Sequence, residues 1–249
     1  MSQILNDLLN SYKNSGKPAL DRRVLACWLI FRPASWLPTT AFIATGWSAN
    51  AVTLLAASLL PIIWGLLLSG DWNLAKAGYV LFFCFTLLDY VDGNIARYRK
   101  TNSVFGKTLD GFVDQLASAT YIFVACGNIR LHAHLLPAEF EAIAGAWSTF
   151  MIACSAYTDM RIKAFALEAG TSSSGSKPKA AQKSWKNLAE QFQENLAALS
   201  PVALLVLGLL ELPSFYTVGY FLFFALIYPP RIALKLWRSR KDLSVPRSS

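Results

Sequence analysis

The chain has 249 residues, of which 54% are hydrophobic and only 15% are charged, and its mean hydropathy is +0.37. This composition excludes an ordinary soluble domain and indicates a protein that folds in lipid. The 23 Lys and Arg outnumber the 15 Asp and Glu, for a formal net charge of +8, which favours contact with anionic headgroups or phosphorylated substrates.

Residues 1–48 precede the first long apolar run and mix apolar with basic side chains. Within residues 20–43, large apolar side chains such as Trp28 alternate with three arginines, and this predicts an amphipathic helix lying on the membrane surface. We expect Pro33 and Pro38 to interrupt that helix, because proline lacks a backbone N–H and clashes with the preceding turn. Residues 1–48 are therefore assigned to a cytoplasmic, interfacial segment.

Six apolar runs follow this segment. A bilayer core about 30 Å thick needs roughly 20 apolar helical residues. Four runs predict spanning helices directly, at residues 51–68, 142–158, 196–210 and 212–228. Two shorter runs, residues 77–88 and 115–128, reach this length only if their helices continue to Ala96 and begin near Gly106, which brings acidic residues into both.

The predicted fold is therefore an all-α integral membrane protein, with six transmembrane helices preceded by a cytoplasmic amphipathic N-terminal helix. The six helices form one domain at residues 49–238, and residues 239–249 form a basic cytoplasmic tail. The four cysteines are scattered, with no CxxC pair, so the sequence indicates neither a disulfide nor a zinc site.

The basic residues are distributed unevenly across the membrane in this topology. With six spans, one side receives the N-terminal segment, residues 97–107, residues 159–190 and all residues after the last span ends at residue 228, which together hold 21 of the 23 Lys and Arg. Only Lys76 and Arg130 fall on the other side. The positive-inside rule then places both termini in the cytoplasm, and we expect a multi-pass protein of the bacterial inner membrane. The spread of charge over four segments argues against a nucleic-acid partner.

Four aspartates at the ends of the second and third predicted spans form the strongest functional pattern. Asp89 and Asp92 are three residues apart and Asp110 and Asp114 are four apart, so each pair lies on one face of its helix. The short turn between the two helices makes them antiparallel neighbours, and the two pairs can converge. Carboxylates in a membrane are functional candidates by default, because each is costly unless it faces a cavity, a partner or an ion.

Oxygen-only ligands favour Mg²⁺ or Mn²⁺ over zinc. Two such ions would neutralise a diphosphate and polarise its phosphorus, and one carboxylate could take a proton from an attacking hydroxyl. The pattern therefore predicts phosphoryl transfer. The alternative is that the four aspartates serve as helix caps and form salt bridges with neighbouring basic residues at the membrane surface.

The wider spacing resembles the signature of the CDP-alcohol phosphotransferases, also called CDP-alcohol phosphatidyltransferases. All eight fixed positions are present at the required spacing: Asp89, Asp92, Gly93, Ala96, Arg97, Gly106, Asp110 and Asp114. The resemblance implies a six-helix fold, usually dimeric, whose active site opens to the cytoplasm. It implies two divalent ions, Mg²⁺ or Mn²⁺, bound by Asp89, Asp92 and Asp110, with Asp114 as a ligand or near-ligand and the general base.

The same resemblance implies a nucleotide site around these acids. Gly93 would let the nucleotide approach the helix backbone, and Arg97 would bind the diphosphate or position a carboxylate. Upstream, residues 48–53 resemble the Pro-Asn-x-x-Thr opening of the first span, with Ala49 in place of proline. The residues expected to line the nucleotide site are Asn50, Thr53, Gly93, Ala96, Arg97, Ser103 and Gly106.

We expect a transferase of phospholipid biosynthesis that uses a CDP-alcohol donor, CDP-diacylglycerol first, and a small alcohol or polyol-phosphate acceptor, with membrane lipid around a homodimer. A transferase from a soluble CDP-polyol to a polyol phosphate is the alternative within the family. An intramembrane prenyltransferase and a cation transporter are the alternatives outside it. Arg161 and Lys163 either bind a phosphate of the acceptor, as basic residues near there do in related enzymes, or anchor the fourth span.

Overall fold

The computed structural model describes residues 2–243, except residues 16, 102 and 169–184. The described residues form helices and no strand, which confirms the all-α prediction. In chain order the elements are α1 (Ser2–Asn14), α2 (Lys17–Asp21), the π-helical turn η1 (Cys27–Phe31), α3 (Arg32–Ala44), α4 (Ala49–Leu67), α5 (Trp72–Tyr98), α6 (Val104–Ala117), α7 (Thr120–Arg130), α8 (Ala138–Glu168), α9 (Trp185–Leu209) and α10 (Pro213–Leu243).

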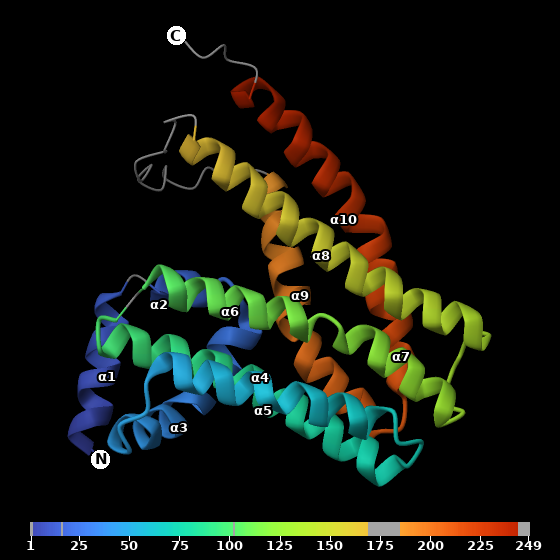
Figure 1. Cartoon of the computed structure of the whole chain (residues 1–249), viewed down its shortest axis with the longest axis horizontal. Coiled ribbons are helices and arrows are strands. Elements are labelled where there is room, and N and C mark those ends of the chain that lie inside the picture. The colour runs from blue at the N-terminus through green and yellow to red at the C-terminus, as the bar shows by residue number, and fades with distance from the viewer. Residues whose placement is uncertain (1, 16, 102, 169–184, 244–249) are drawn as a thin grey trace.

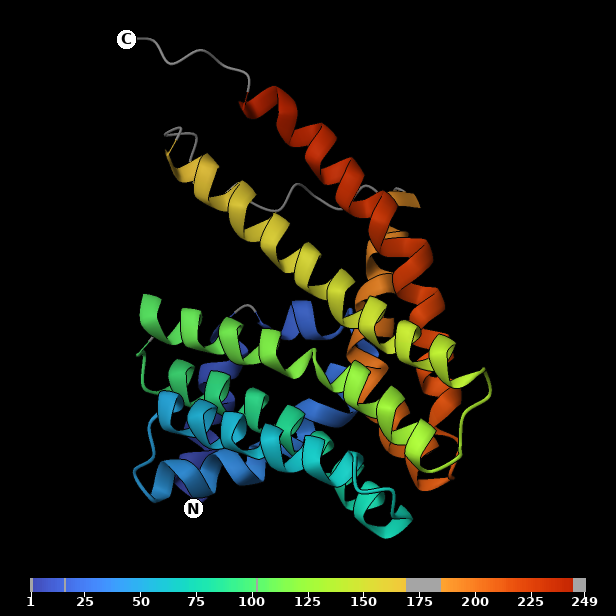
Figure 2. The ribbon, with the colours of Figure 1, turned by 45° about the vertical axis from the view of Figure 1, so that its right-hand side comes forward.

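The helices form two groups (Figure 1). The first contains α1 to α6, in which α4 packs along α5 and both α3 and α1 contact α5. The second contains α8 and α10, which pack together and diverge from the first group toward their described C-terminal ends (Figure 2). Helix α7 contacts α4 as well as α8 and α10, and α9 contacts both α5 and α10, so these two helices connect the groups.

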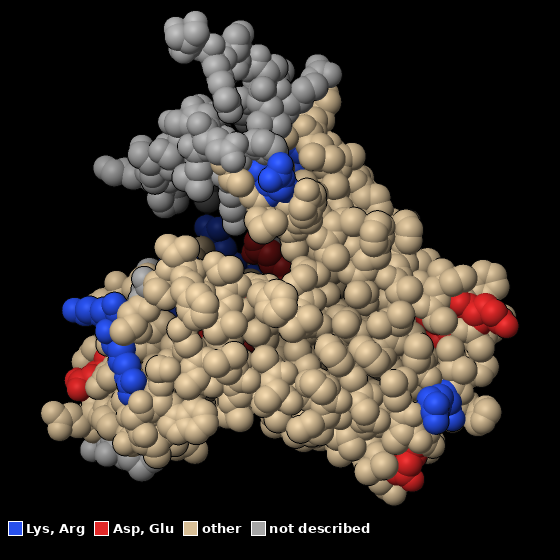
Figure 3. Space-filling view, viewed as in Figure 1, with Lys and Arg blue, Asp and Glu red and all other residues tan. Residues whose placement is uncertain are grey.

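Four described helices are long and apolar enough to cross a membrane: Ala49–Leu67, Trp72–Tyr98, Gln191–Leu209 and Pro213–Trp237. On the face shown in Figure 3, charged side chains gather at the left and right ends of the lower part of the molecule, and most of the outer surface between them is uncharged. The chain is therefore an integral membrane protein.

The third predicted span is wrong as a single helix, because the structure divides residues 106–128 between α6 and α7. At the break, Ser118 Oγ donates to the carbonyl of Gln115 at 2.7 Å, and Thr149 Oγ1 of α8 donates to the carbonyl of Ser118 at 3.1 Å. Hydroxyl groups here replace regular helical hydrogen bonds. Neither α6 nor α7 alone has the length that a bilayer core requires.

The predicted interruption at Pro33 and Pro38 is also wrong. Pro33 lies in the first turn of α3, where a backbone N–H has no helical partner, and Pro38 lies within α3. Before Pro33, the N–H of Arg32 bonds to the carbonyl of Cys27, so a wider π-helical turn leads into α3 without a gap.

The last helix is longer than predicted. The sequence places its end at residue 228, but α10 continues through Pro229 and Pro230 to Leu243. The expected boundary at residue 238 therefore falls inside a helix, and of the expected tail only residues 239–243 are described.

A buried polar cluster fixes α7 against α8 and α10. Glu141 of α8 is fully buried and accepts hydrogen bonds from Asn128 Nδ2 of α7 at 2.8 Å and from Ser214 Oγ of α10 at 3.0 Å. Asn128 Nδ2 also donates to Thr217 Oγ1 at 3.0 Å. Because a buried polar group without a partner is costly in lipid, these bonds specify how the three helices meet.

Close packing of α7 on α8 depends on Gly145. A Cβ at this position would lie 2.6 Å from Ala125 Cβ and 2.8 Å from the carbonyl oxygen of Tyr121. We therefore expect Gly145→Ala to destabilise the fold by about 1–3 kcal/mol through overpacking, measured as a lower melting temperature in detergent. Gly219→Ala is the matched control, because a Cβ there meets nothing within 4 Å, and it should be neutral or slightly stabilising. Equal melting temperatures for the two variants would contradict this packing.

Candidate active site

Three helices of the first group bring the predicted site residues together. The C-terminal half of α5 carries Asp89 and Asp92, α6 carries Asp110 and Asp114, and the first turns of α4 carry Asn50 and Thr53. Helix α4 begins at Ala49, and Ser48 Oγ caps it by accepting from the N–H of Ala51 at 3.2 Å. Proline is favoured at the first helical position but is not needed there, so alanine at position 49 leaves the start of α4 intact.

Asp89, Asp92 and Asp110 form a compact cluster of carboxylates. One oxygen from each lies within 4.8 Å of the other two. Asp92 is buried and the other two are partly buried. Among the described residues, ion pairs form at Asp21, Asp159 and Glu211 and at none of these three. Three neighbouring carboxylates repel one another, and a hard divalent cation with oxygen ligands fits this donor set.

Asp114 lies beside this cluster and is not one of the three converging donors. It interacts electrostatically with both Asp89 and Asp110. The structure thus brings all four predicted acids into one region, but it distinguishes three that converge from one that lies next to them. The separate role that the resemblance implies for Asp114 stays a prediction.

Thr53 orients one of the three carboxylates. Its Oγ1 donates to Asp92 Oδ2 at 2.6 Å, and both side chains are buried. Because one oxygen of Asp92 is held by this bond, the direction of the other is fixed as well. A hydrogen bond of this kind typically tunes the affinity of a carboxylate for a metal ion.

A pocket of about 470 Å³ lies next to the carboxylates. Asp92 and Asp110 line it, and so do all seven residues that the sequence assigns to the nucleotide site: Asn50, Thr53, Gly93, Ala96, Arg97, Ser103 and Gly106. The remaining lining residues are Ser15, Lys17, Ala49, Thr101 and Lys107.

Four of these lining residues are not identified by the sequence analysis. Thr101 and Lys107 lie in or beside the turn between the two aspartate pairs, so their position in the sequence could have identified them as candidates for the pocket. Ser15 and Lys17 lie at the junction of α1 and α2, far from any recognised motif. Only the packing of the N-terminal helices against α5 places them at the pocket.

The two glycines of the signature allow close approaches on the pocket wall. A Cβ on Gly93 would lie 3.2 Å from Nη1 of Arg97, so the absence of a side chain leaves room for the guanidinium to fold back along α5. A Cβ on Gly106 would lie 3.0 Å from Asn50 Oδ1 and 3.1 Å from Ser103 Oγ. Ser103 caps α6 by accepting from the N–H of Gly106 at 2.9 Å.

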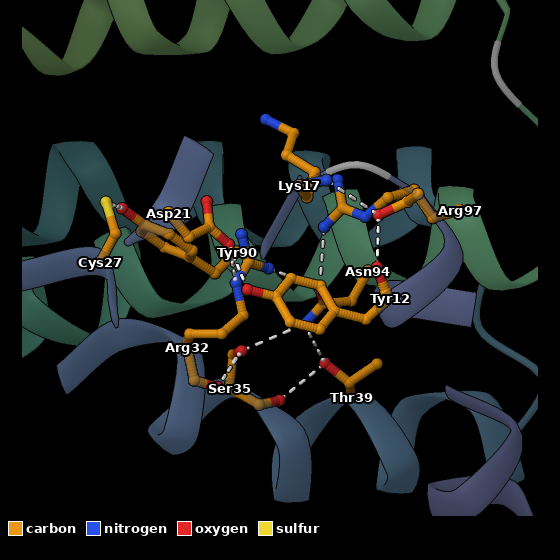
Figure 4. A network of polar contacts seen from close by, with 11 residues as sticks. Tyr12, Lys17, Asp21, Cys27, Arg32, Ser35, Thr39, Tyr90, Asn94 and Arg97 are labelled. Atoms are coloured by element: carbon orange, nitrogen blue, oxygen red, sulfur yellow. Dashed lines mark hydrogen bonds and ion pairs between the residues drawn. The ribbon is translucent and has the colours of Figure 1, made fainter. Parts of the chain in front are cut away.

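The N-terminal helices contact Arg97 through a polar network, shown in Figure 4. Asn94 Oδ1 accepts from Arg97 Nη2 at 2.8 Å and from Arg32 Nη1 at 2.7 Å. Arg32 Nε in turn donates to Asp21 Oδ2 at 2.8 Å, and the Tyr12 hydroxyl donates to the same oxygen at 2.9 Å. Burial, together with this bond to Asp21, raises the pKa of Tyr12 to about 12, so the phenol remains a donor at neutral pH.

The basic residues near the end of α8 lie outside this pocket. Asp159 forms an ion pair with Lys235 of α10 at 2.5 Å. The side chain of Lys163 is outside the described residues, and Arg161 is not among the residues that line the pocket. The proposed contact of Arg161 and Lys163 with an acceptor phosphate therefore stays a prediction.

Comparison with known proteins identifies one family. A family model described as CDP-alcohol phosphatidyltransferase matches residues 47–228. The matched residues contain α4 to α9, the first half of α10 and all four aspartates, and they exclude α1, α2, η1 and α3. No curated protein matches the chain.

Binding of Mn²⁺ to the purified protein tests the carboxylate cluster directly. We expect Thr53→Val to weaken Mn²⁺ binding by about 10-fold or more, because it removes the hydrogen bond that orients Asp92. Asp89→Asn and Asp110→Asn should weaken it further. Thr40→Val is the matched control, because buried Thr40 donates its hydroxyl to the carbonyl of Trp36 within its own helix. Unchanged Mn²⁺ affinity in all three site variants would rule out this metal site.

Proposed function

The chain belongs to the CDP-alcohol phosphatidyltransferase family, whose members are transferases of substituted phosphate groups, and from this premise we propose a specific reaction and mechanism. The enzyme moves the phosphoryl-linked group of a CDP-alcohol, CDP-diacylglycerol first, onto the hydroxyl of an acceptor alcohol and releases CMP. The observation that carries the proposal is the pocket, where the expected nucleotide-site residues and two of the clustered carboxylates share one wall.

Asp89, Asp92 and Asp110 hold the metal in this proposal, and Asp114 completes the site. Two divalent cations, Mg²⁺ or Mn²⁺, when bound would neutralise the diphosphate and polarise the phosphorus under attack. Asp114, next to the converging carboxylates, accepts the proton from the acceptor hydroxyl. The bond formed joins the acceptor oxygen to the phosphorus that carries the transferred alcohol, and the bond broken is the one from that phosphorus to CMP.

The cations of the pocket bind the phosphates of the donor. Arg97, Lys107 and Lys17 all line the pocket. Their positive charges complement the diphosphate and the negative charge that develops on the departing CMP. Asn50 and Ser103 face one another across Gly106 at the opening of α4 and α6. We assign these two polar side chains to contacts with the nucleoside.

The proposed topology has six spans, with both termini and the active site on the cytoplasmic side of a bacterial inner membrane. Helices α6 and α7 together supply the third span and α8 supplies the fourth. The distribution of Lys and Arg supports this orientation. In the N-terminal segment, residues 1–48, the apolar side chains Leu25, Trp28, Leu29 and Leu37 are exposed, which supports a position at the membrane interface.

The proposal treats residues 49–238 as the catalytic domain, followed by a basic end at residues 239–249, and the enzyme as a homodimer. Transfer from a soluble CDP-polyol to a polyol phosphate is the second candidate, because the pocket residues would bind the shared CDP group of either donor. The family match argues against the prenyltransferase and the cation transporter.

Release of CMP in liposomes tests the reaction. The purified enzyme should release CMP from CDP-diacylglycerol when Mg²⁺ or Mn²⁺ is present with one of serine, glycerol 3-phosphate, inositol or inositol phosphate, and excess chelator should abolish turnover. In sealed vesicles, only those that expose the cytoplasmic face should use added soluble acceptor. Turnover in excess chelator would contradict the metal mechanism, and release of CMP only from a soluble CDP-polyol would favour the second candidate.

Asp114 should differ in kind from the metal-binding aspartates. Asp114→Asn keeps the shape of the side chain but cannot accept a proton, so we expect turnover to fall by about 10² to 10⁴ while CDP binding largely survives. Asp89→Asn should reduce Mn²⁺ binding and CDP binding along with turnover. Both variants are compared in the same detergent. Near-normal turnover of Asp114→Asn would remove Asp114 as the base, and equal losses of CDP binding would make it a fourth ligand.

A further inference from the structure

A single buried amide connects the N-terminal segment to the pocket arginine. Asn94 lies on α5 between Gly93 and the signature residues that follow, and it is 1% exposed. Its Oδ1 accepts from two guanidinium groups, Arg97 Nη2 at 2.8 Å and Arg32 Nη1 at 2.7 Å. In Figure 4, Asn94 lies between Arg97 and the α3 residues Arg32, Ser35 and Thr39.

The orientation of this amide is set by α3. Asn94 Nδ2 donates to Ser35 Oγ at 3.0 Å and to Thr39 Oγ1 at 3.2 Å. Both hydroxyls already donate their own protons to main-chain carbonyls, Ser35 to Arg32 at 2.9 Å and Thr39 to Ser35 at 2.6 Å. They therefore act as acceptors toward Asn94. Flipping the amide would direct its NH₂ group at two cations, so only one orientation satisfies all partners.

Arg32 is itself fixed and neutralised by the N-terminal helices. It is 5% exposed and pairs with Asp21, which is 7% exposed. Its guanidinium lies 5.0 Å from the ring centroid of Tyr12 and 5.2 Å from that of Tyr90, within the range of cation–π attraction. A second guanidinium beside Arg97 would otherwise be unfavourable, and the carboxylate of Asp21 offsets that repulsion.

Asn94 and Gly93 together define where the guanidinium of Arg97 lies. Asn94 accepts a hydrogen bond from Nη2 of Arg97. Nη1 needs the space left by the missing side chain of Gly93, because a Cβ there would lie only 3.2 Å from it. An arginine side chain has several rotatable bonds and loses much of its freedom when it is ordered. A guanidinium that is already ordered in the free enzyme does not incur that cost again when it binds an anion.

We propose that Asn94 is a positioning residue for Arg97, and that the N-terminal segment contributes to nucleotide binding through Ser35, Thr39 and the Arg32–Asp21 pair. This segment lies outside the residues matched by the family model. The inference rests on the proposed function, in which Arg97 binds the donor diphosphate. Asn94 itself does not line the pocket, so it acts through Arg97.

Binding of CDP and of cytidine to the full-length protein separates positioning from general stability. Asn94→Leu removes the shared acceptor with little change in size. We expect it to weaken CDP binding by about 10-fold, equivalent to about 1.4 kcal/mol, and to leave cytidine binding within about twofold, because cytidine has no diphosphate. In turnover, the KM for the donor should rise while the KM for the acceptor stays unchanged. Thr40→Val, which removes a local bond to the carbonyl of Trp36, should change none of these values.

A double-mutant cycle then tests whether Asn94 acts through Arg97. Arg97→Met alone should weaken CDP binding, and adding Asn94→Leu to it should cause no further loss beyond about twofold. Additive losses, or equal losses for CDP and cytidine, would overturn the inference while leaving the proposed function in place. If Arg97→Met does not affect CDP binding, the diphosphate role of Arg97 fails, and the inference fails with it.

A second variant covers the case in which Asn94→Leu does not fold. Arg32→Lys keeps the positive charge beside Asp21 but removes the Nη1 contact with Asn94. It should weaken CDP binding by about threefold or more in the wild-type background and should have no further effect in the Arg97→Met background. An effect of equal size in both backgrounds would assign the N-terminal network to stability alone.

Discussion

Mutual repulsion among three clustered carboxylates is the constraint on which this structure depends. Asp89 and Asp92 of α5 and Asp110 of α6 place oxygens within 4.8 Å of one another. Carboxylates in such a place must be compensated by hydrogen bonds or cations. Thr53 supplies one hydrogen bond, and the remaining negative charge suits the divalent ions of the proposed mechanism. The repulsion among the carboxylates and their proposed capacity to bind divalent ions therefore have the same source.

The backbone around the cluster is arranged so that three helices can approach closely. Gly106 allows the start of α6 to meet the start of α4, and Ser103 and Ser48 cap those two helices at the pocket. Helix caps satisfy the N–H groups that a helix end leaves unpaired. As a result, capped helix starts contribute to the pocket, and Asn50 of the first turn of α4 lines it.

The N-terminal segment shows how residues outside a family signature can become part of its site. The buried Arg32–Asp21 pair by itself adds little stability, because desolvation offsets much of its attraction. Its position is more informative: it ties α2 and α3 to Asn94 of α5, one residue from Gly93. The second helix group contributes differently. Helices α8 and α10 are held to α7 by hydrogen bonds of Glu141 with Asn128 and Ser214, residues that follow the four aspartates in the sequence.

The sequence by itself determined the all-helical class, the family, the four aspartates and the seven residues that line the pocket with them. The convergence of the aspartates follows from local spacing, because positions three and four apart share a helix face and a short turn makes helices neighbours; the seven lining residues were expected from the resemblance to the family signature. The break between α6 and α7, the unbroken passage through Pro33 and Pro38 and the length of α10 were decided by tertiary structure. At the break, a partner distant in sequence, Thr149 of α8, donates to the carbonyl of Ser118. The placement of Lys17 at the pocket and of Arg32 beside Asn94 has the same origin, since no local pattern encodes which helix the N-terminal segment packs against.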